Sequence, residues 1–156
     1  MPLTCDASYA CFLQAQYSAR CVVEKAVGQC PPLAIAPPPA QSELIADDLR
    51  DLQAQLPEPS PPITLSGPAE ALGAAWVLAG SSMGNRAMLA RRRKAGLAGP
   101  VRFFSDERLP AYFATLREVL AAPHDARTVA AAITGARATF AVFEHAFAAH
   151  ALEQAA

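Results

Sequence analysis

Hydrophobic side chains recur at helical spacing through most of the chain, and no stretch of useful length alternates apolar and polar residues with period two. One stretch is apolar nearly all round, with Glu70 as its only charge, which is typical of a central buried helix. In the last stretch the apolar positions from Val129 to Phe147 step by four, three, four, three and four residues, a near-heptad seam. The pattern predicts an all-α protein with helices over residues 6–28, 41–55, 69–79, 85–95, 110–121 and 126–154.

Prolines and glycines mark the predicted helix ends. Residues 31–40 hold five prolines and residues 57–67 hold four, so both segments are predicted to be extended connections. Pro68 suits the first position of a helix, because its missing N–H needs no partner there. Gly96 is expected to end the helix over 85–95, and Asp125 is expected to cap the last helix.

The composition fits a single domain, residues 1–156. Hydrophobic residues make up 53% of the chain, enough for a sizeable core, and charged residues make up 17%. No apolar run reaches the ~18 residues of a membrane span, and the N-terminus lacks the basic and apolar regions of a signal peptide. We therefore expect a cytoplasmic protein that does not enter a membrane.

Charge is unevenly placed along the chain. The formal net charge is −1, which argues against a globally basic nucleic-acid-binding protein. Residues 1–85 carry three basic and eight acidic side chains, whereas residues 86–156 carry ten and six. A basic cluster in the predicted helix over 85–95 is a solvated helix face, a site that captures carboxylates or phosphates, or a nucleic-acid contact, which is the least favoured because the rest of the chain is acidic. Its members are Arg86, Arg91, Arg92, Arg93 and Lys94.

Cysteines and histidines offer little metal chemistry. The four cysteines all fall in the first thirty residues, and none of their spacings matches a CxxC pair. We expect structural or inert thiols, with redox sensing and ligand binding as alternatives. Among the three histidines, His145 and His150 are five residues apart and so lie on different faces of a helix, while His124 follows a proline in a predicted loop. No metal site is predicted.

Two glycines four residues apart interrupt an otherwise strong helical pattern. Each of Gly80 and Gly84 costs about 1 kcal/mol relative to alanine in a helix interior, so their presence needs a reason. One explanation is close helix–helix packing, in which small residues let two backbones touch. The other is a kinked helix whose bare backbone lies against a flat ligand.

The surroundings of these glycines make the second explanation more specific. Residues 71–86, with the sequence Ala-Leu-Gly-Ala-Ala-Trp-Val-Leu-Ala-Gly-Ser-Ser-Met-Gly-Asn-Arg, resemble the distal helix of the bacterial heme oxygenases. Further stretches agree with that family in order and spacing: Asp48-Leu49-x-x-Leu52, the pair Phe103-Phe104, and residues 136–144. The stretch from Tyr9 to Val27 resembles the family's second helix, so the resemblance spans nearly the whole chain.

The resemblance implies a heme-oxygenase-like bundle of about five to six helices, with heme held between a proximal helix and the glycine-kinked distal helix. The family is an oxidoreductase that cleaves heme with O2 and electrons to biliverdin, CO and iron. Gly80, Ser81 and Gly84 would belong to the distal helix that approaches the heme. Arg86 and Arg117 are candidates for binding the heme propionates, by their neighbourhood rather than by a motif.

The chain departs from the family at the positions that carry its chemistry. The family's axial histidine lies on a helix before the one that the first predicted helix resembles, and no histidine precedes His124 here. Ala79 stands where the family has a glutamate, and Trp76 stands at its aromatic position. Catalytic residues therefore stay unknown, and the favoured interpretation is a degenerate, non-catalytic binding or regulatory module for heme, a bilin or a partner protein. An active heme oxygenase and a cofactor-free helical interaction module are the alternatives.

The absent proximal helix also predicts an assembly. In the family that helix covers a groove between the first predicted helix and the last one. Its loss would expose several hundred Å² of apolar surface, which monomers rarely tolerate. We therefore expect a homodimer, or a partner protein, at this groove. It is lined by Tyr9, Phe12, Leu13, Val129, Ile133, Phe140, Phe143 and Phe147, with Asp47, Asp48, Asp51 and the basic cluster outside it.

Overall fold

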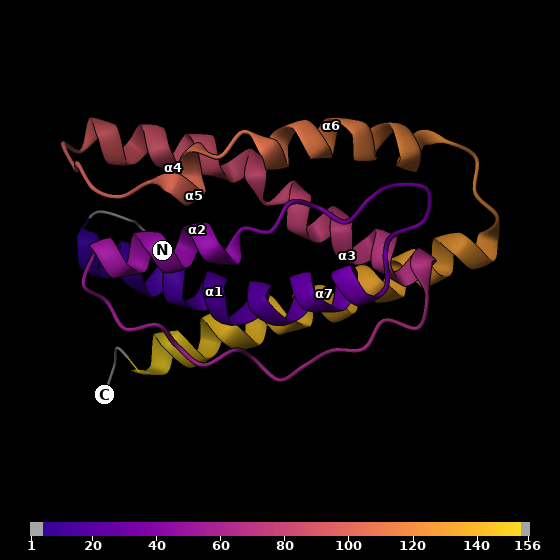
Figure 1. The fold of residues 1–156 in the computed structure, drawn as a ribbon, viewed down its shortest axis with the longest axis horizontal. Helices are drawn as coiled ribbons and strands as arrows, with labels where there is room; N and C mark the ends of the chain where they lie inside the picture. Colours follow the sequence, from indigo (N-terminus) through magenta and orange to yellow (C-terminus); the bar gives the residue numbers. More distant parts are fainter. Residues whose placement is uncertain (1–4, 154–156) are drawn as a thin grey trace.

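A computed structural model describes residues 5–153, and within that range the chain is helical with no strand (Figure 1). The prediction of an all-α protein is confirmed. The predicted end of the last helix at residue 154 lies outside the described residues. The helices are α1 (Asp6–Gln29), α2 (Ser42–Asp51), α3 (Pro68–Gly80), α4 (Ser82–Lys94), α5 (Arg102–Ser105), α6 (Arg108–Ala121) and α7 (Ala126–Glu153).

The apolar helix α3 lies at the centre, as its pattern predicted. It packs along α7 and also contacts α1 on one side and α6 on the other, so three helices surround it (Figure 1). Its residues from Ala71 to Ala79 are buried except for Trp76, which is 42% exposed. A helix that is apolar on nearly every face needs such a position, because each face then meets another helix.

Two glycines allow α3 and α7 to touch backbone to backbone. A Cβ atom on Gly73 would lie 1.8 Å from the carbonyl oxygen of Ala132, and one on Gly135 would lie 2.0 Å from that of Glu70. Both distances are far below van der Waals contact, so neither position accepts a side chain without moving a helix. The close helix packing considered for Gly80 and Gly84 therefore occurs at different glycines.

The apolar stripe at the start of α1 is buried, so the prediction that it lines an open groove is wrong. Tyr9 and Leu13 are fully buried and Phe12 nearly so, in a cluster with Phe103 and Phe104 of α5. Ring centroids of Phe104 lie 5.2 Å from Tyr9 and 5.7 Å from Phe12. The helix α2 packs against α1, and the Phe103 and Phe104 side chains of α5 lie against this stripe.

The prediction that Asp48 lies on an outer face is also wrong. Its carboxylate is fully buried and accepts hydrogen bonds from the backbone N–H groups of Arg102 and Phe103, at 3.1 and 3.0 Å. The Arg102 guanidinium donates to it at 3.1 Å, and the Tyr9 hydroxyl lies at 3.5 Å. Burial, with the nearby Asp48 charge, raises the pKa of Tyr9. Asp48 thus joins α1, α2 and α5.

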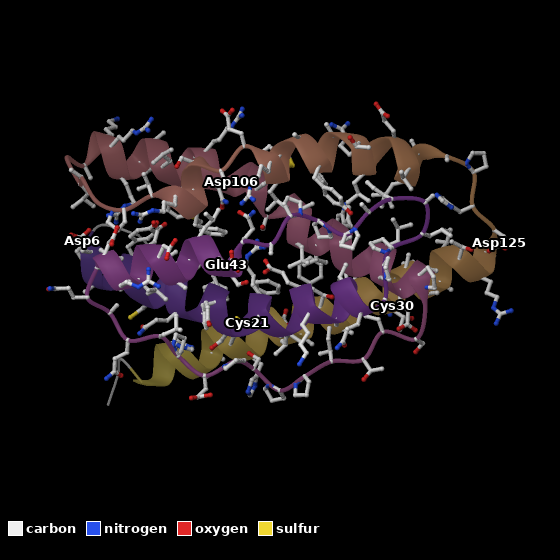
Figure 2. The ribbon with its side chains drawn as sticks, viewed as in Figure 1. Asp6, Cys21, Cys30, Glu43, Asp106 and Asp125 are labelled. Carbon is white, nitrogen blue, oxygen red and sulfur yellow. The ribbon has the colours of Figure 1, made fainter. Side chains whose placement is uncertain are left out.

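The helix ends follow the local signals. Pro68 stands in the first turn of α3, and Gly96 has a left-handed φ of 71° after α4. Asp125, labelled in Figure 2, lies at the start of α7 and accepts from the Thr128 N–H at 2.7 Å. That hydrogen bond lowers the pKa of Asp125. The prediction for 41–55 was too long, because α2 ends at Asp51 and Gln53 takes a φ of 54°.

The second proline-rich connection is extended, as predicted, and lies along α1. The Ser60 N–H donates to the Ser18 carbonyl at 2.9 Å, and the Ser18 hydroxyl donates to the Glu58 carbonyl at 2.6 Å. The Gln14 side chain donates to the Gln55 carbonyl at 2.8 Å. This segment has no helical hydrogen bonds of its own, so these bonds to α1 satisfy some of its backbone groups and hold it beside that helix.

Candidate functional site

A cleft of about 440 Å³ lies where α3 ends, between α1, α6 and α7. We call it the Trp76 cleft. Most of its lining is apolar, and the aromatic rings come from α3, α6 and α7. A second hollow of about 290 Å³ shares Trp76 and continues along α7 past Val129 and Ile133. The Trp76 cleft is lined by Gln16, Trp76, Val77, Gly80, Ser81, Met83, Phe113, Phe140 and Phe143.

Aromatic side chains in this cleft remain open to solvent. The Trp76 and Phe140 rings meet edge to face with centroids 6.1 Å apart, yet Phe140 is 46% exposed. The Met83 side chain beside them is exposed as well. Large apolar side chains gathered in a hollow, rather than scattered singly, are typical of a binding surface.

The backbone at the end of α3 forms one wall of the cleft. α3 ends at Gly80 and α4 begins at Ser82, with Ser81 between them. A Cβ atom on Gly80 would meet only the Phe113 ring, at 4.0 Å, and one on Gly84 would meet nothing within 4 Å. The explanation of these two glycines by close helix packing is therefore wrong, and their contact with a flat ligand stays a prediction.

A buried cation lies behind the cleft, and the sequence analysis did not anticipate it. The Arg20 side chain is fully buried in α1, where its Nε donates to the Gln16 side chain at 3.0 Å and an Nη donates to the Ser81 hydroxyl at 2.6 Å. Its guanidinium lies 5.2 Å from the Phe103 ring centroid and 5.9 Å from that of Phe143. Only the position of Arg20 between apolar residues of α1 hinted at this burial.

Glu24 balances this charge and ties it to the next helix. The carboxylate lies 3.4 Å from the Arg20 guanidinium and also accepts hydrogen bonds from Gln41 N–H, Ser42 N–H and the Ser42 hydroxyl. It thereby satisfies N–H groups at the N-terminus of α2. Burial lowers the pKa of Arg20, and Glu24 opposes that shift.

Not all predicted site residues come together. Gly80 and Ser81 line the Trp76 cleft, whereas Gly84, Arg86 and Arg117 are exposed and do not line it. The residues that the sequence analysis missed at this site are Gln16 and Phe113, which approach it from other helices. Helical spacing gave no signal for them.

The basic cluster on α4 is not simply a solvated face. Arg91, Arg93 and Lys94 are exposed, but Arg92 is fully buried. Its guanidinium lies 4.0 Å from the Tyr9 ring centroid and pairs with the Asp6 carboxylate at 2.7 Å. This side chain therefore anchors α4 to the start of α1.

The histidines and cysteines do not assemble a metal site within residues 5–153, where no group of three His, Cys, Asp or Glu side chains is placed to hold an ion. His124 lines the second hollow, and its Nε2 lies 2.9 Å from the Val119 carbonyl. No disulfide joins the cysteines. Cys5 caps α1, and hydrogen bonds with Ser8 lower the pKa of its thiol.

Comparison of the chain with protein-family models, with curated proteins and with solved structures gave no match. The resemblance to the bacterial heme oxygenases thus stays a prediction. Across residues 5–153, no helix combines the length and the apolar character needed to cross a membrane.

Proposed function

We propose that the protein is a non-catalytic binding module that takes a flat, largely apolar ligand of the tetrapyrrole class in the Trp76 cleft. One observation carries the proposal: rings from three helices and the bare backbone of Gly80 line one hollow of about 440 Å³. Aromatic rings and exposed backbone suit a planar molecule, because both allow close contact with its face. The sequence resemblance around Gly80 and Ser81 points to the same class of ligand.

Heme fits this cleft only in part. The apolar walls suit the macrocycle, but within residues 5–153 no histidine or cysteine lines the cleft. His124 lines the second hollow, which shares Trp76 with the cleft. Heme proteins hold the iron through an axial side chain, usually histidine, cysteine, methionine or tyrosine, and only the exposed Met83 offers such an atom in the lining. We therefore expect the ring, rather than the iron, to supply the affinity.

Titration with hemin, metal-free protoporphyrin IX and biliverdin tests the proposal. Trp76 is the only tryptophan of the chain, so binding in the cleft should quench the protein's tryptophan fluorescence. We expect hemin and protoporphyrin IX to bind with affinities that agree within about threefold. Phe140→Ala should weaken both about tenfold, because it removes an aromatic contact. Leu56→Ala is the matched control, since Leu56 is 54% exposed and does not line the cleft.

Three outcomes would contradict the proposal. The first is no quenching by any of the three ligands, which would favour a cofactor-free interaction module. The second is equal losses of affinity in the Phe140 and Leu56 variants. The third is stoichiometric biliverdin and CO when hemin, O2 and a reductase are supplied, which would show an active heme oxygenase.

A second candidate function is self-association through the outer face of α7. Val129 and Ile133 are both exposed there and line the second hollow together with Leu72. Apolar side chains gathered in this way commonly mark a protein–protein contact. A homodimer would cover them with the same residues of a second copy.

Light scattering at tens of micromolar tests this assembly. We expect a dimer, and we expect Ile133→Glu to raise its dissociation constant at least tenfold, because a charge would then enter an apolar contact. Thr134→Glu is the matched control, since Thr134 is exposed on α7 and lines neither hollow. A wild-type monomer at this concentration would contradict self-association.

A further inference from the structure

The second proline-rich connection presents its side chains to solvent with a period of three over residues 54–63. Every third position is partly buried against the helices, and the two positions between are exposed. Figure 1 shows this segment along the lower edge of the molecule, between α2 and α3. A polyproline II helix has three residues per turn, so one row of its positions can face the protein while two rows face outward. The partly buried positions are Ala54, Pro57, Ser60 and Ile63.

Hydrogen bonds to α1 repeat with the same period. The Gln55 carbonyl accepts from the Gln14 side chain at 2.8 Å, and three residues later the Glu58 carbonyl accepts from the Ser18 hydroxyl at 2.6 Å. The Ser60 N–H donates to the Ser18 carbonyl at 2.9 Å. These bonds, together with the fixed φ of each proline, hold the segment extended before any partner arrives. Less conformational entropy is then lost when a partner binds.

One outward row of this segment is entirely apolar. We call it the proline ridge; it consists of Leu56, Pro59 and Pro62, and all three are exposed. Within residues 5–153, their carbonyls accept no hydrogen bond. The other proline-rich connection offers no such continuous ridge, because a turn interrupts it at Ala34, where φ is 61°. The proline ridge therefore combines apolar side chains and unpaired acceptors on one outer face.

The charge of the segment narrows the kind of partner. Glu58 is exposed, and it is the only charged residue between Leu52 and Leu65. Domains that bind polyproline II segments use aromatic-lined grooves, and Trp and Tyr side chains can both pack against prolines and donate to carbonyls. A basic side chain at the edge of such a groove would attract Glu58, whereas an acidic edge would repel it.

We infer that the proline ridge is a docking surface for another protein, a domain with an aromatic-lined groove for polyproline II segments and a basic side chain at the edge of that groove. The ridge faces away from α1, so such a domain binds without displacing the segment. None of residues 54–63 lines the Trp76 cleft or the second hollow. The inference thus goes beyond the proposed function and does not depend on it.

Binding of the whole protein to an array of purified SH3, WW and EVH1 domains, chosen to include acidic and basic groove edges, tests the inference. We expect the basic-edged domains to bind more tightly than the acidic-edged ones. Pro59→Ala combined with Pro62→Ala should weaken the tightest complex at least tenfold, because two ring contacts are lost. Pro31→Ala combined with Pro37→Ala is the matched control, since both prolines are exposed in the other connection. It should change the affinity by less than about twofold.

Glu58→Lys tests the charge separately. This variant should reverse the preference, so that acidic-edged domains bind more tightly than basic-edged ones. A further measurement uses the wild type only: when the tightest domain is added, the backbone N–H signals of Leu56 and Glu58 in a ¹H–¹⁵N NMR spectrum should shift, and the indole N–H signal of Trp76 should not. This readout does not depend on how the variants fold.

Several outcomes would overturn the inference. They are binding by no domain of the array, equal losses from the two pairs of proline substitutions, an unchanged preference in Glu58→Lys, and shifts at Trp76 in place of Leu56. A wild-type oligomer that dissociates when Pro59 and Pro62 are replaced would also overturn it, because the ridge would then contact a second copy of the chain. None of these results bears on the ligand of the Trp76 cleft, which the titration with hemin and protoporphyrin IX tests by itself.

Discussion

Replacing Gly135 by alanine is expected to lower the free energy of unfolding by about 3 kcal/mol, although alanine is the better helix former. The new methyl group would lie 2.0 Å from the Glu70 carbonyl oxygen. The obstacle is the backbone of α3, which cannot turn aside as a flexible side chain would. The two helices must separate, and the contact between α3 and α7 is the most extensive in the fold. Thermal unfolding followed by circular dichroism should show a fall of roughly 10 °C in the midpoint.

Gly84→Ala is the matched control for this substitution. Gly84 also lies inside a helix, but a Cβ atom there would meet nothing within 4 Å. Because Gly84 lies in the first turn of α4, the gain in helix propensity should raise the free energy of unfolding by at most about 1 kcal/mol. Equal effects of the two substitutions would contradict the close approach of α3 and α7.

Asp48→Ala is expected to destabilise the protein by a similar amount, about 3 kcal/mol. The substitution leaves the backbone N–H groups of Arg102 and Phe103 without their acceptor in a buried site, and it removes the link between α2 and α5. Urea unfolding would measure the loss. The ion pair between Asp48 and Arg102 contributes only a small part of this loss, because the Arg102 side chain is half exposed and also pairs with Asp51.

The neighbouring Asp47→Ala variant provides the comparison for Asp48. Asp47 pairs with Arg50 at the surface of α2, and such exposed pairs contribute little. Its removal should change the free energy of unfolding by less than about 0.5 kcal/mol. A loss at Asp48 no larger than that at Asp47 would show that the buried carboxylate does not join α2 to α5.

The helices themselves were predictable because their signals are local. Pro68, Gly96 and Asp125 act within a turn of the helix end that they define, and the structure confirms all three. The buried position of α3 followed from its own composition, since a helix apolar on all faces must be covered. The early end of α2 was missed because the left-handed turn at Gln53 carries no glycine to mark it.

Burial of charged side chains was not predictable in the same way. Arg20, Asp48 and Arg92 are fully buried, and each depends on a partner distant in the sequence, such as Ser81, Phe103 or Asp6. A pattern of polar and apolar positions counts such side chains as exposed. Their partners become known only when the helices are placed against one another.

The dependence on how helices pack also explains which residues of the candidate site could be predicted from the sequence. Gly80 could be singled out because a glycine inside a strong helix needs a reason, and Ser81 because it belongs to the stretch that resembles the distal helix; both line the Trp76 cleft. Gln16 and Phe113 could not, because nothing in their own helices distinguishes them from ordinary core residues. Likewise, the sequence marks every helical glycine as costly but does not tell that Gly135, rather than Gly84, faces another backbone.

The most direct test of a ligand site in the Trp76 cleft is a ¹H–¹⁵N NMR spectrum of the protein before and after saturation with protoporphyrin IX. A ligand site in this cleft predicts that the backbone signals of Gly80 and Ser81 and the indole N–H signal of Trp76 shift or broaden most. The signals of Ile45 and Phe104 should stay nearly unchanged, because both residues are buried in the core cluster around Tyr9, which lies outside the lining of the cleft. Changes confined to the basic end of α4, or spread evenly over the chain, would contradict it.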